Sequence, residues 1–149
     1  MNLLRLSSVG LCVALAILLA GCGSGHPASG GLSKNEYAAA VTRICSATTK
    51  QAQGLVTTSV GDLLERNGRK VINLTDQEIR KLKAVSPPEG LRARASRFIA
   101  SVEVAHDRLV DVVQAARNRD DSGFERSSNA LSQLSQRVTR AANIFGATC

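Results

Sequence analysis

The sequence predicts an all-α protein, an up-down helical bundle of about four helices closed by one disulfide bond. Within residues 33–149, apolar residues recur at steps of three and four, the spacing of one helix face. Glycine and proline residues separate these stretches, and sequence signatures of helix starts precede them. Short connections between the stretches favour antiparallel neighbours. The chain has no Trp, one Tyr and three Phe, so its core must be aliphatic and rich in Ala.

The first helix is expected to begin at a capping box, with Ser33 as the N-cap and Glu36 three residues later. Residues at steps of four, three and four then share one face: Tyr37, Val41, Ile44 and Thr48. The pattern weakens and resumes over residues 60–66, either as part of the same helix or after a kink. Asn67 and Gly68 then predict a stop and a turn.

The second helix is expected to be short and to begin at another capping box, formed by Thr75 and Glu78. Pro87 and Pro88 are expected to end it, because proline disfavours the helical conformation in the residue before it. The third helix has the clearest pattern, with steps of four and three over nearly four heptads. Its packing seam consists of Leu91, Ala95, Phe98, Val102, Ala105, Leu109, Val112 and Ala116.

The fourth helix is expected after a turn at residues 118–123, with a third capping box formed by Ser122 and Glu125. Its apolar face carries Phe124, Leu131, Leu134, Val138, Ala141 and Phe145. Gly146 is expected to end the helix. In an up-down bundle, the first helix begins at the end where the fourth helix finishes.

The N-terminal segment has the three parts of an export signal. Arg5 is the only charged residue before Lys34, and residues 11–20 are almost wholly apolar. The small residues Ala20 and Gly21 follow. The alternative is an uncleaved transmembrane helix, which needs about 20 apolar residues. The N-terminal run nearly reaches that length only if its charged and polar residues are counted.

The segment Leu19-Ala20-Gly21-Cys22 resembles the lipobox of bacterial lipoproteins. The resemblance implies that residues 1–21 are a cleaved signal peptide and that Cys22 carries diacylglycerol and palmitate. Two or more acyl chains suffice for stable membrane anchoring. Residues 22–32 then form a lipidated, Gly- and Ser-containing linker, and residues 33–149 form the helical domain. The expected location is the extracytoplasmic face of the cell membrane.

Export leaves two cysteines to explain, Cys45 and Cys149, because Cys12 is removed with the signal and Cys22 carries lipid. An even pair in an oxidising compartment favours one disulfide bond. The bundle topology would bring the two residues together. The alternatives are two free thiols and an intermolecular bridge through Cys149. A disulfide that closes a loop of about a hundred residues is worth roughly 4 to 5 kcal/mol in chain-entropy models.

The chain is basic, and removal of Arg5 leaves 18 basic and 12 acidic residues, a net charge of +6. Half of the basic residues fall within residues 66–97, which makes that segment a candidate contact for anionic lipid headgroups or a cell-wall polymer. The alternative is an ordinary solvated face. Nucleic acid is not expected as a partner, because no aromatic residue interleaves the segment and the compartment is wrong. The nine residues are Arg66, Arg69, Lys70, Arg80, Lys81, Lys83, Arg92, Arg94 and Arg97.

No catalytic residue, metal ligand or cofactor site is expected. Glu103 and His106 have the Glu-x-x-His spacing of di-iron bundles, but those proteins need two such motifs. The other histidine, His26, lies in the linker. His106 is therefore expected to be a surface residue beside a carboxylate. Cys45 and His106 offer the residue types of a nucleophilic pair, but the disulfide accounts for Cys45 more simply. No glycine-rich phosphate loop or paired-Cys zinc spacing is present.

Together, these pieces resemble small actinobacterial lipoproteins of poorly defined function. Beyond the lipobox, the resemblance rests on Tyr37, Val41 and Arg43-Ile44-Cys45, on Pro87-Pro88 with Leu91, and on the Gly146 to Cys149 end. It implies an envelope location, a helical exported domain and an accessory or binding role, with an envelope protein as an unidentified partner. The sequence thus predicts a non-enzymatic lipoprotein. The alternative function is a binder of small apolar ligands or lipids between the helices.

Overall fold

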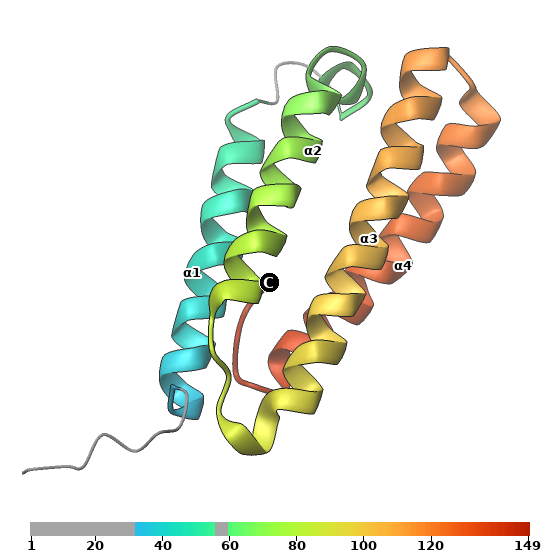
Figure 1. Cartoon of the computed structure of the whole chain (residues 1–149). Helices are drawn as coiled ribbons and strands as arrows, with labels where there is room; N and C mark the ends of the chain where they lie inside the picture. The colour runs from blue at the N-terminus through green and yellow to red at the C-terminus, as the bar shows by residue number, and fades with distance from the viewer. Residues whose placement is uncertain (1–31, 56–59) are drawn as a thin grey trace, which may run out of the picture.

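The computed structural model describes residues 32–55 and 60–149, which form four α-helices in up-down order (Figure 1). They are α1 (Lys34–Gln53), α2 (Val60–Ala84), α3 (Arg92–Asn118) and α4 (Asp121–Asn143), with a 3-10 turn, η1 (Glu89–Leu91), before α3. The described residues contain no strand. The predicted all-α bundle of four helices is therefore confirmed. The predicted signal peptide, Cys22 and the linker up to Gly31 lie outside the described residues.

The start of α1 is the capping box that the sequence predicts. The backbone N–H of Glu36 donates to the Ser33 hydroxyl oxygen at 3.3 Å, and the backbone N–H of Ser33 donates to the Glu36 carboxylate at 2.9 Å. The Ser33 hydroxyl also donates to this carboxylate, at 2.6 Å. These hydrogen bonds, the hydroxyl's first, lower the pKa of Glu36 below its usual value because they favour the ionised form. The reciprocal bonds satisfy donors that a helix start otherwise leaves unpaired.

The course of α2 differs from the sequence prediction in two places. The predicted turn at Asn67 and Gly68 is wrong, because α2 continues through both residues. Gly68 is buried against α3, and a Cβ atom at this position would overlap the side chain of Val113. The predicted capping box at Thr75 is also wrong, because Thr75 lies inside α2 and its hydroxyl donates to the Ile72 carbonyl at 2.9 Å. Glycine here permits close helix packing and does not form a turn.

The predicted break at Pro87 and Pro88 is confirmed, since α2 ends at Ala84 and α3 starts at Arg92. The third capping box is misplaced by two residues. Asp120, rather than Ser122, is the N-cap of α4, and its carboxylate accepts the Gly123 backbone N–H at 2.9 Å. That bond and a second one from the Ser122 hydroxyl lower the pKa of Asp120. The connection is short because Arg119 ends α3 in the left-handed conformation, at φ 55°.

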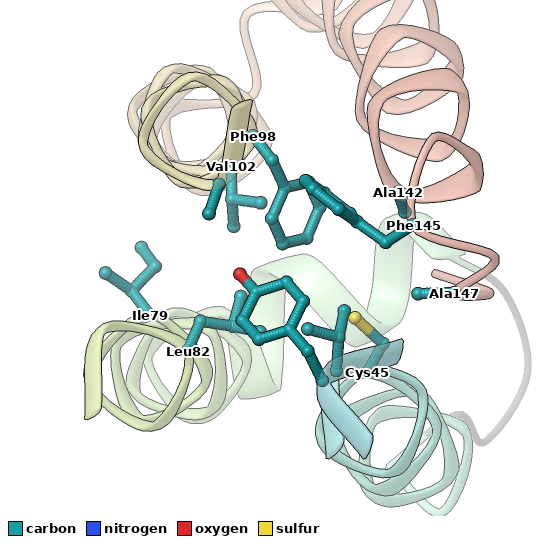
Figure 2. Close-up of a cluster of buried hydrophobic side chains, with 11 residues drawn as sticks. Cys45, Ile79, Leu82, Phe98, Val102, Ala142, Phe145 and Ala147 are labelled. Carbon is teal, nitrogen blue, oxygen red and sulfur yellow. The ribbon is translucent and has the colours of Figure 1, made fainter. Parts of the chain in front are cut away.

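The hydrophobic core consists of two separate clusters. The larger cluster lies where α1 begins and α4 ends (Figure 2). At its centre, the ring of Phe145 packs edge-on against Tyr37 and Phe98, with ring centroids 5.2 and 6.0 Å apart. Around these rings the larger cluster contains Val41, Cys45, Ile79, Leu82, Ala95, Val102, Ala142 and Ala147. The smaller cluster joins α2 to α3 further along the bundle and contains Leu64, Val112 and Val113.

Residues beyond α4 close the bundle. Helices pack in chain order, α1 on α2, α2 on α3 and α3 on α4. The C-terminal segment then returns to α1, where the predicted disulfide joins Cys149 to Cys45 with a Cα–Cα distance of 5.1 Å. The backbone N–H of Thr148 also donates to the Thr42 hydroxyl oxygen at 3.0 Å. The disulfide and this hydrogen bond thus fasten the residues that follow α4 to α1.

Candidate functional site

A cavity of about 300 Å³ lies between the two core clusters. All four helices and the C-terminal residue line it, so it occupies the middle of the bundle. Its aliphatic lining comes from α3 and α4 and consists of Val102, Ala105, Leu109, Leu131 and Val138. Its polar lining consists of Thr49, Thr75, Glu78, His106, Ser135 and Thr139. The disulfide between Cys45 and Cys149 forms part of the remaining wall.

The cavity exists because each helix contributes a small or polar side chain at this level. On α3, the seam that holds Phe98 in the larger cluster and Val112 in the smaller one has Ala105 between them. Thr75 on α2 and Ser135 on α4 also line the cavity, and Ser135 is exposed to solvent at its opening. Protein interiors are usually packed with few voids larger than a water molecule. A cavity of this size between the core clusters, open to solvent on one side, is therefore a candidate binding site.

Glu78 is the carboxyl group in the cavity wall. It forms no hydrogen bond or ion pair with any other described residue. Burial raises its pKa to about 7, against a smaller lowering effect from Lys81, because the charged form loses hydration without gaining a partner. A carboxyl group with a strongly raised pKa inside a cavity is a candidate for ligand contact.

Glu78 is not among the site residues that the sequence predicts, because the Thr75 to Glu78 spacing is typical of a helix start. The signal was present in the helical spacing. Glu78 lies seven residues after Val71 and four before Leu82, so one continuous helix places all three on its inward side. Because a turn was predicted at Gly68, residues 71–82 were not treated as one continuous helix, and the inward position of Glu78 was not predicted.

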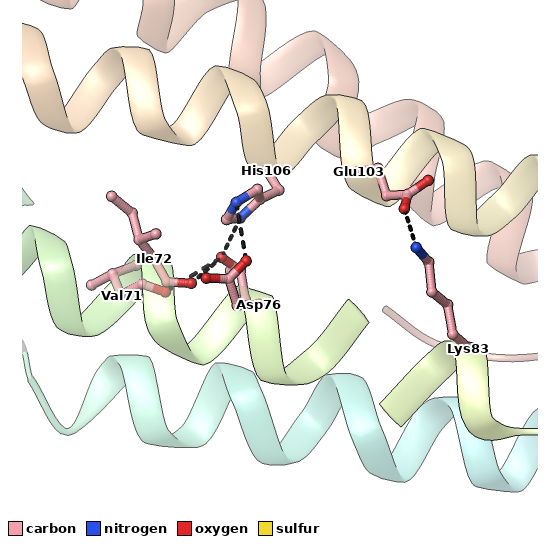
Figure 3. A network of polar contacts seen from close by, with 7 residues as sticks. Val71, Ile72, Asp76, Lys83, Glu103 and His106 are labelled. Atoms are coloured by element: carbon pink, nitrogen blue, oxygen red, sulfur yellow. Dashed lines mark hydrogen bonds and ion pairs between the residues drawn. The ribbon is translucent and has the colours of Figure 1, made fainter. Parts of the chain in front are cut away.

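The expectation that His106 is a surface residue is wrong. Its side chain is only 14% exposed and lies between α3 and α2 (Figure 3). The Nδ1 atom is 2.8 Å from the Thr75 hydroxyl oxygen, and the Nε2 atom is 3.3 Å from an Asp76 carboxylate oxygen. The Thr75 hydroxyl also lies 2.9 Å from the Ile72 carbonyl oxygen, to which it can donate. Thr75 and Asp76 thus hold the two ring nitrogens of His106 between α2 and α3.

Glu103 and His106 do not act together. Glu103 forms an ion pair with Lys83 at 2.6 Å, whereas His106 contacts Thr75 and Asp76 (Figure 3). Both contacts join α3 to α2. Among the described residues, no group of three or more His, Cys, Asp or Glu side chains is arranged to hold a metal ion.

The nine basic residues of segment 66–97 are all exposed, and they do not form one site. At 100° per residue, five of them fall within an arc of about 120° on the outward side of α2. Lys83 points to Glu103 on α3, and the other three lie in the first turns of α3. The residues of the α2 basic stripe are Arg66, Arg69, Lys70, Arg80 and Lys81.

Within residues 32–55 and 60–149, no helix combines the length and the apolar character needed to cross a membrane. The chain matches no protein-family model, no curated protein and no solved structure. The class of protein that the fold and the site define is an all-α, disulfide-closed bundle with a cavity between its helices that is partly open to solvent.

Proposed function

We propose that this protein is a non-enzymatic cell-envelope lipoprotein whose helical domain binds small apolar ligands in the cavity between its helices. The cavity is the observation that carries the proposal. Its volume of about 300 Å³ lies at the small end of the range of known ligand sites. Its aliphatic lining favours an apolar ligand, and the resemblance to actinobacterial lipoproteins favours an envelope location.

Saturable binding of a simple apolar molecule tests the proposal. Equilibrium dialysis of n-octanol against the full chain in nanodiscs measures binding, and empty nanodiscs at the same lipid concentration measure partition into lipid. Ala105→Leu fills the cavity and should weaken octanol binding at least about tenfold, since one or two lost methylene sites are worth 1 to 3 kcal/mol. Ala100→Leu, which is exposed on the same helix, is the matched control. Equal octanol binding by the two variants would contradict the proposal.

The proposed anchor at Cys22 is tested separately. Cys22→Ala should move the protein from the membrane fraction to the soluble fraction, because no thiol would remain to accept diacylglycerol. Unchanged membrane retention would indicate an uncleaved transmembrane helix instead. This outcome would change the mode of attachment without bearing on the cavity.

A second candidate function, adhesion to an anionic surface of the envelope, is favoured by the α2 basic stripe. The stripe is exposed, and the residues that separate its two halves on the outward side, Asn73 and Gln77, are uncharged. Each cation near an anionic lipid surface is worth about 1 kcal/mol. Arg69→Gln with Arg80→Gln should reduce retention on vesicles that contain phosphatidylglycerol, and vesicles of phosphatidylcholine alone give the baseline. Equal retention of both proteins on the anionic vesicles would remove this function.

A further inference from the structure

We infer that the ligand of the cavity carries a protonated amine on an apolar body, and that the amine binds against the carboxylate of Glu78. The inference rests on the proposed ligand-binding function and names the class of ligand. Its basis is the set of hydrogen-bond partners inside the cavity.

Most polar side chains of the cavity already have partners in the protein. The hydroxyl groups of Ser135 and Thr139 donate to the backbone carbonyls of Leu131 and Cys149, at 2.9 and 3.0 Å. His106 is held by Thr75 and Asp76. The carboxyl group of Glu78 has no such bond among the described residues. Glu78 and the exposed Thr49 are thus the polar lining residues without a hydrogen-bond or ion-pair partner among the described residues, and Glu78 is the stronger acceptor and the charged one.

The chemistry of a carboxylate selects the ligand group. An ionised carboxylate only accepts hydrogen bonds, so it needs a donor, and a charged donor makes the stronger bond. A ligand carboxylate would place a second negative charge in the same cavity. A wholly apolar ligand would remove water from Glu78 and supply nothing in exchange. An ammonium group supplies both the opposite charge and the donor protons.

The charged groups around Glu78 are few. On α2, the charge of Lys81 lowers the pKa of Glu78 slightly, and the Lys81 side chain is exposed. On α3, His106 is the other titratable group in the cavity wall. The cavity residues of α1 and α4 carry no titratable group apart from the disulfide-bonded Cys45. A bound ammonium thus meets one carboxylate and one imidazole.

The pH dependence follows from the pKa of Glu78 near 7. The ionised fraction of this carboxyl rises from about one tenth at pH 6 to about nine tenths at pH 8. Affinity for an amine that needs the carboxylate should therefore increase about tenfold over this interval. His106 is the other titratable group in the cavity wall, so substitution must separate its effect from that of Glu78.

The test compares three probes of equal chain length, n-octylamine, n-octanol and n-octanoic acid. Equilibrium dialysis uses the full chain in nanodiscs, with empty nanodiscs as the reference for partition. At pH 8, octylamine should bind at least about tenfold more tightly than octanol, since hydrogen bonds to charged groups contribute roughly 1.5 to 3 kcal/mol. Octanoic acid should bind most weakly, and the preference for the amine should shrink about tenfold at pH 6.

Glu78→Gln should reduce the ratio of octylamine to octanol affinity to about one and remove most of its pH dependence. Glu103→Gln is the matched control, because it makes the same chemical change on α3 outside the cavity lining. His106→Gln should retain the preference for the amine. If the pH dependence survives in Glu78→Gln and is absent in His106→Gln, the assignment to Glu78 is wrong.

The outcomes separate this inference from the proposed function. If octanol binds saturably but octylamine is not preferred, or if octanoic acid binds more tightly, the amine inference fails and the ligand-binding function stands. If none of the three probes binds saturably, both fail. If Glu78→Gln does not fold, the pH profile of His106→Gln provides the same decision, because Glu78 is then the titratable group that remains in the cavity lining.

Discussion

Glu78 should make the free energy of unfolding depend on pH in a predictable direction. Its pKa rises from 4.5 to about 7 on folding, so the folded chain holds a proton on this group that the unfolded chain releases. The contribution of this bound proton to the free energy of unfolding is therefore fully present below pH 4.5, decreases as the pH rises to about 7, and is absent above it. Above pH 7, the unmodified chain has an ionised and unpaired carboxylate in its core cavity.

The size of this effect follows from the shift. A change of one pKa unit corresponds to 1.36 kcal/mol, so a shift of about 2.5 units gives roughly 3 kcal/mol. Because the cavity is partly open to solvent, screening reduces this figure, and about 2 kcal/mol is the expected gain. Glu78→Gln removes this titrating group. The free energy of unfolding of the variant, relative to that of the unmodified chain, should therefore be about 2 kcal/mol higher at pH 8 than at pH 4.5.

Urea unfolding of both proteins, followed by circular dichroism with the disulfide intact, measures the difference. The informative quantity is the change with pH in the free-energy difference between variant and unmodified chain, because all other titrating groups cancel. Glu103→Gln is the control, since it removes an exposed carboxylate paired with Lys83 and should cost no more than about 1 kcal/mol. A difference for Glu78→Gln that stays constant from pH 4.5 to pH 8 would refute the reasoning.

Three further predictions concern stability and use the same unfolding assay. Gly68→Val should lower the free energy of unfolding by about 1 to 3 kcal/mol through overlap with α3, whereas Gly90→Val, where a Cβ meets no atom within 4 Å, should change it by less than about 0.5 kcal/mol. Replacement of Cys45 and Cys149 by Ser should cost about 4 to 5 kcal/mol, and thiol titration of the denatured, unreduced domain should find both residues oxidised. Asp120→Ala should lower the free energy of unfolding by removing the N-cap of α4, and the loss should diminish as acid protonates Asp120. Equal losses of unfolding free energy for Gly68→Val and Gly90→Val would contradict the first prediction. A reactive thiol in the denatured, unreduced domain would contradict the second. An unchanged free energy of unfolding for Asp120→Ala would contradict the third.

The fold was predictable because local signals and global topology agree at most elements. The capping box at Ser33, the proline pair after α2 and the seam of α3 each depend on neighbours in sequence, and each is found where the sequence indicates. The pairing of Cys45 with Cys149 followed from topology, since an up-down bundle returns the chain to its starting end.

The errors arose where tertiary packing overrides a local signal. Asn67-Gly68 is a strong turn signal in isolation, yet Gly68 is needed where α2 approaches Val113. Thr75 has the sequence of an N-cap, yet it lies mid-helix and faces His106. The wrong helix start interpreted Glu78 as part of a capping box, so Glu78 was not considered as a cavity residue. His106 was expected at the surface because the sequence has one Glu-x-x-His motif, and its contacts with Thr75 and Asp76 depend on how α2 packs on α3.

The cavity and its carboxyl group also explain each other energetically. An apolar side chain at position 78 would fill space and remove an unpaired charge, so the empty domain would be more stable without Glu78 at neutral pH. A bound ammonium reverses this balance, because it pairs the charge and lowers the pKa of Glu78. Octylamine should accordingly stabilise the unmodified chain more at pH 8 than at pH 6, and Glu78→Gln should lose that difference. Equal stabilisation at both pH values would separate the carboxyl group from ligand binding, and the cavity would then act through its apolar wall alone.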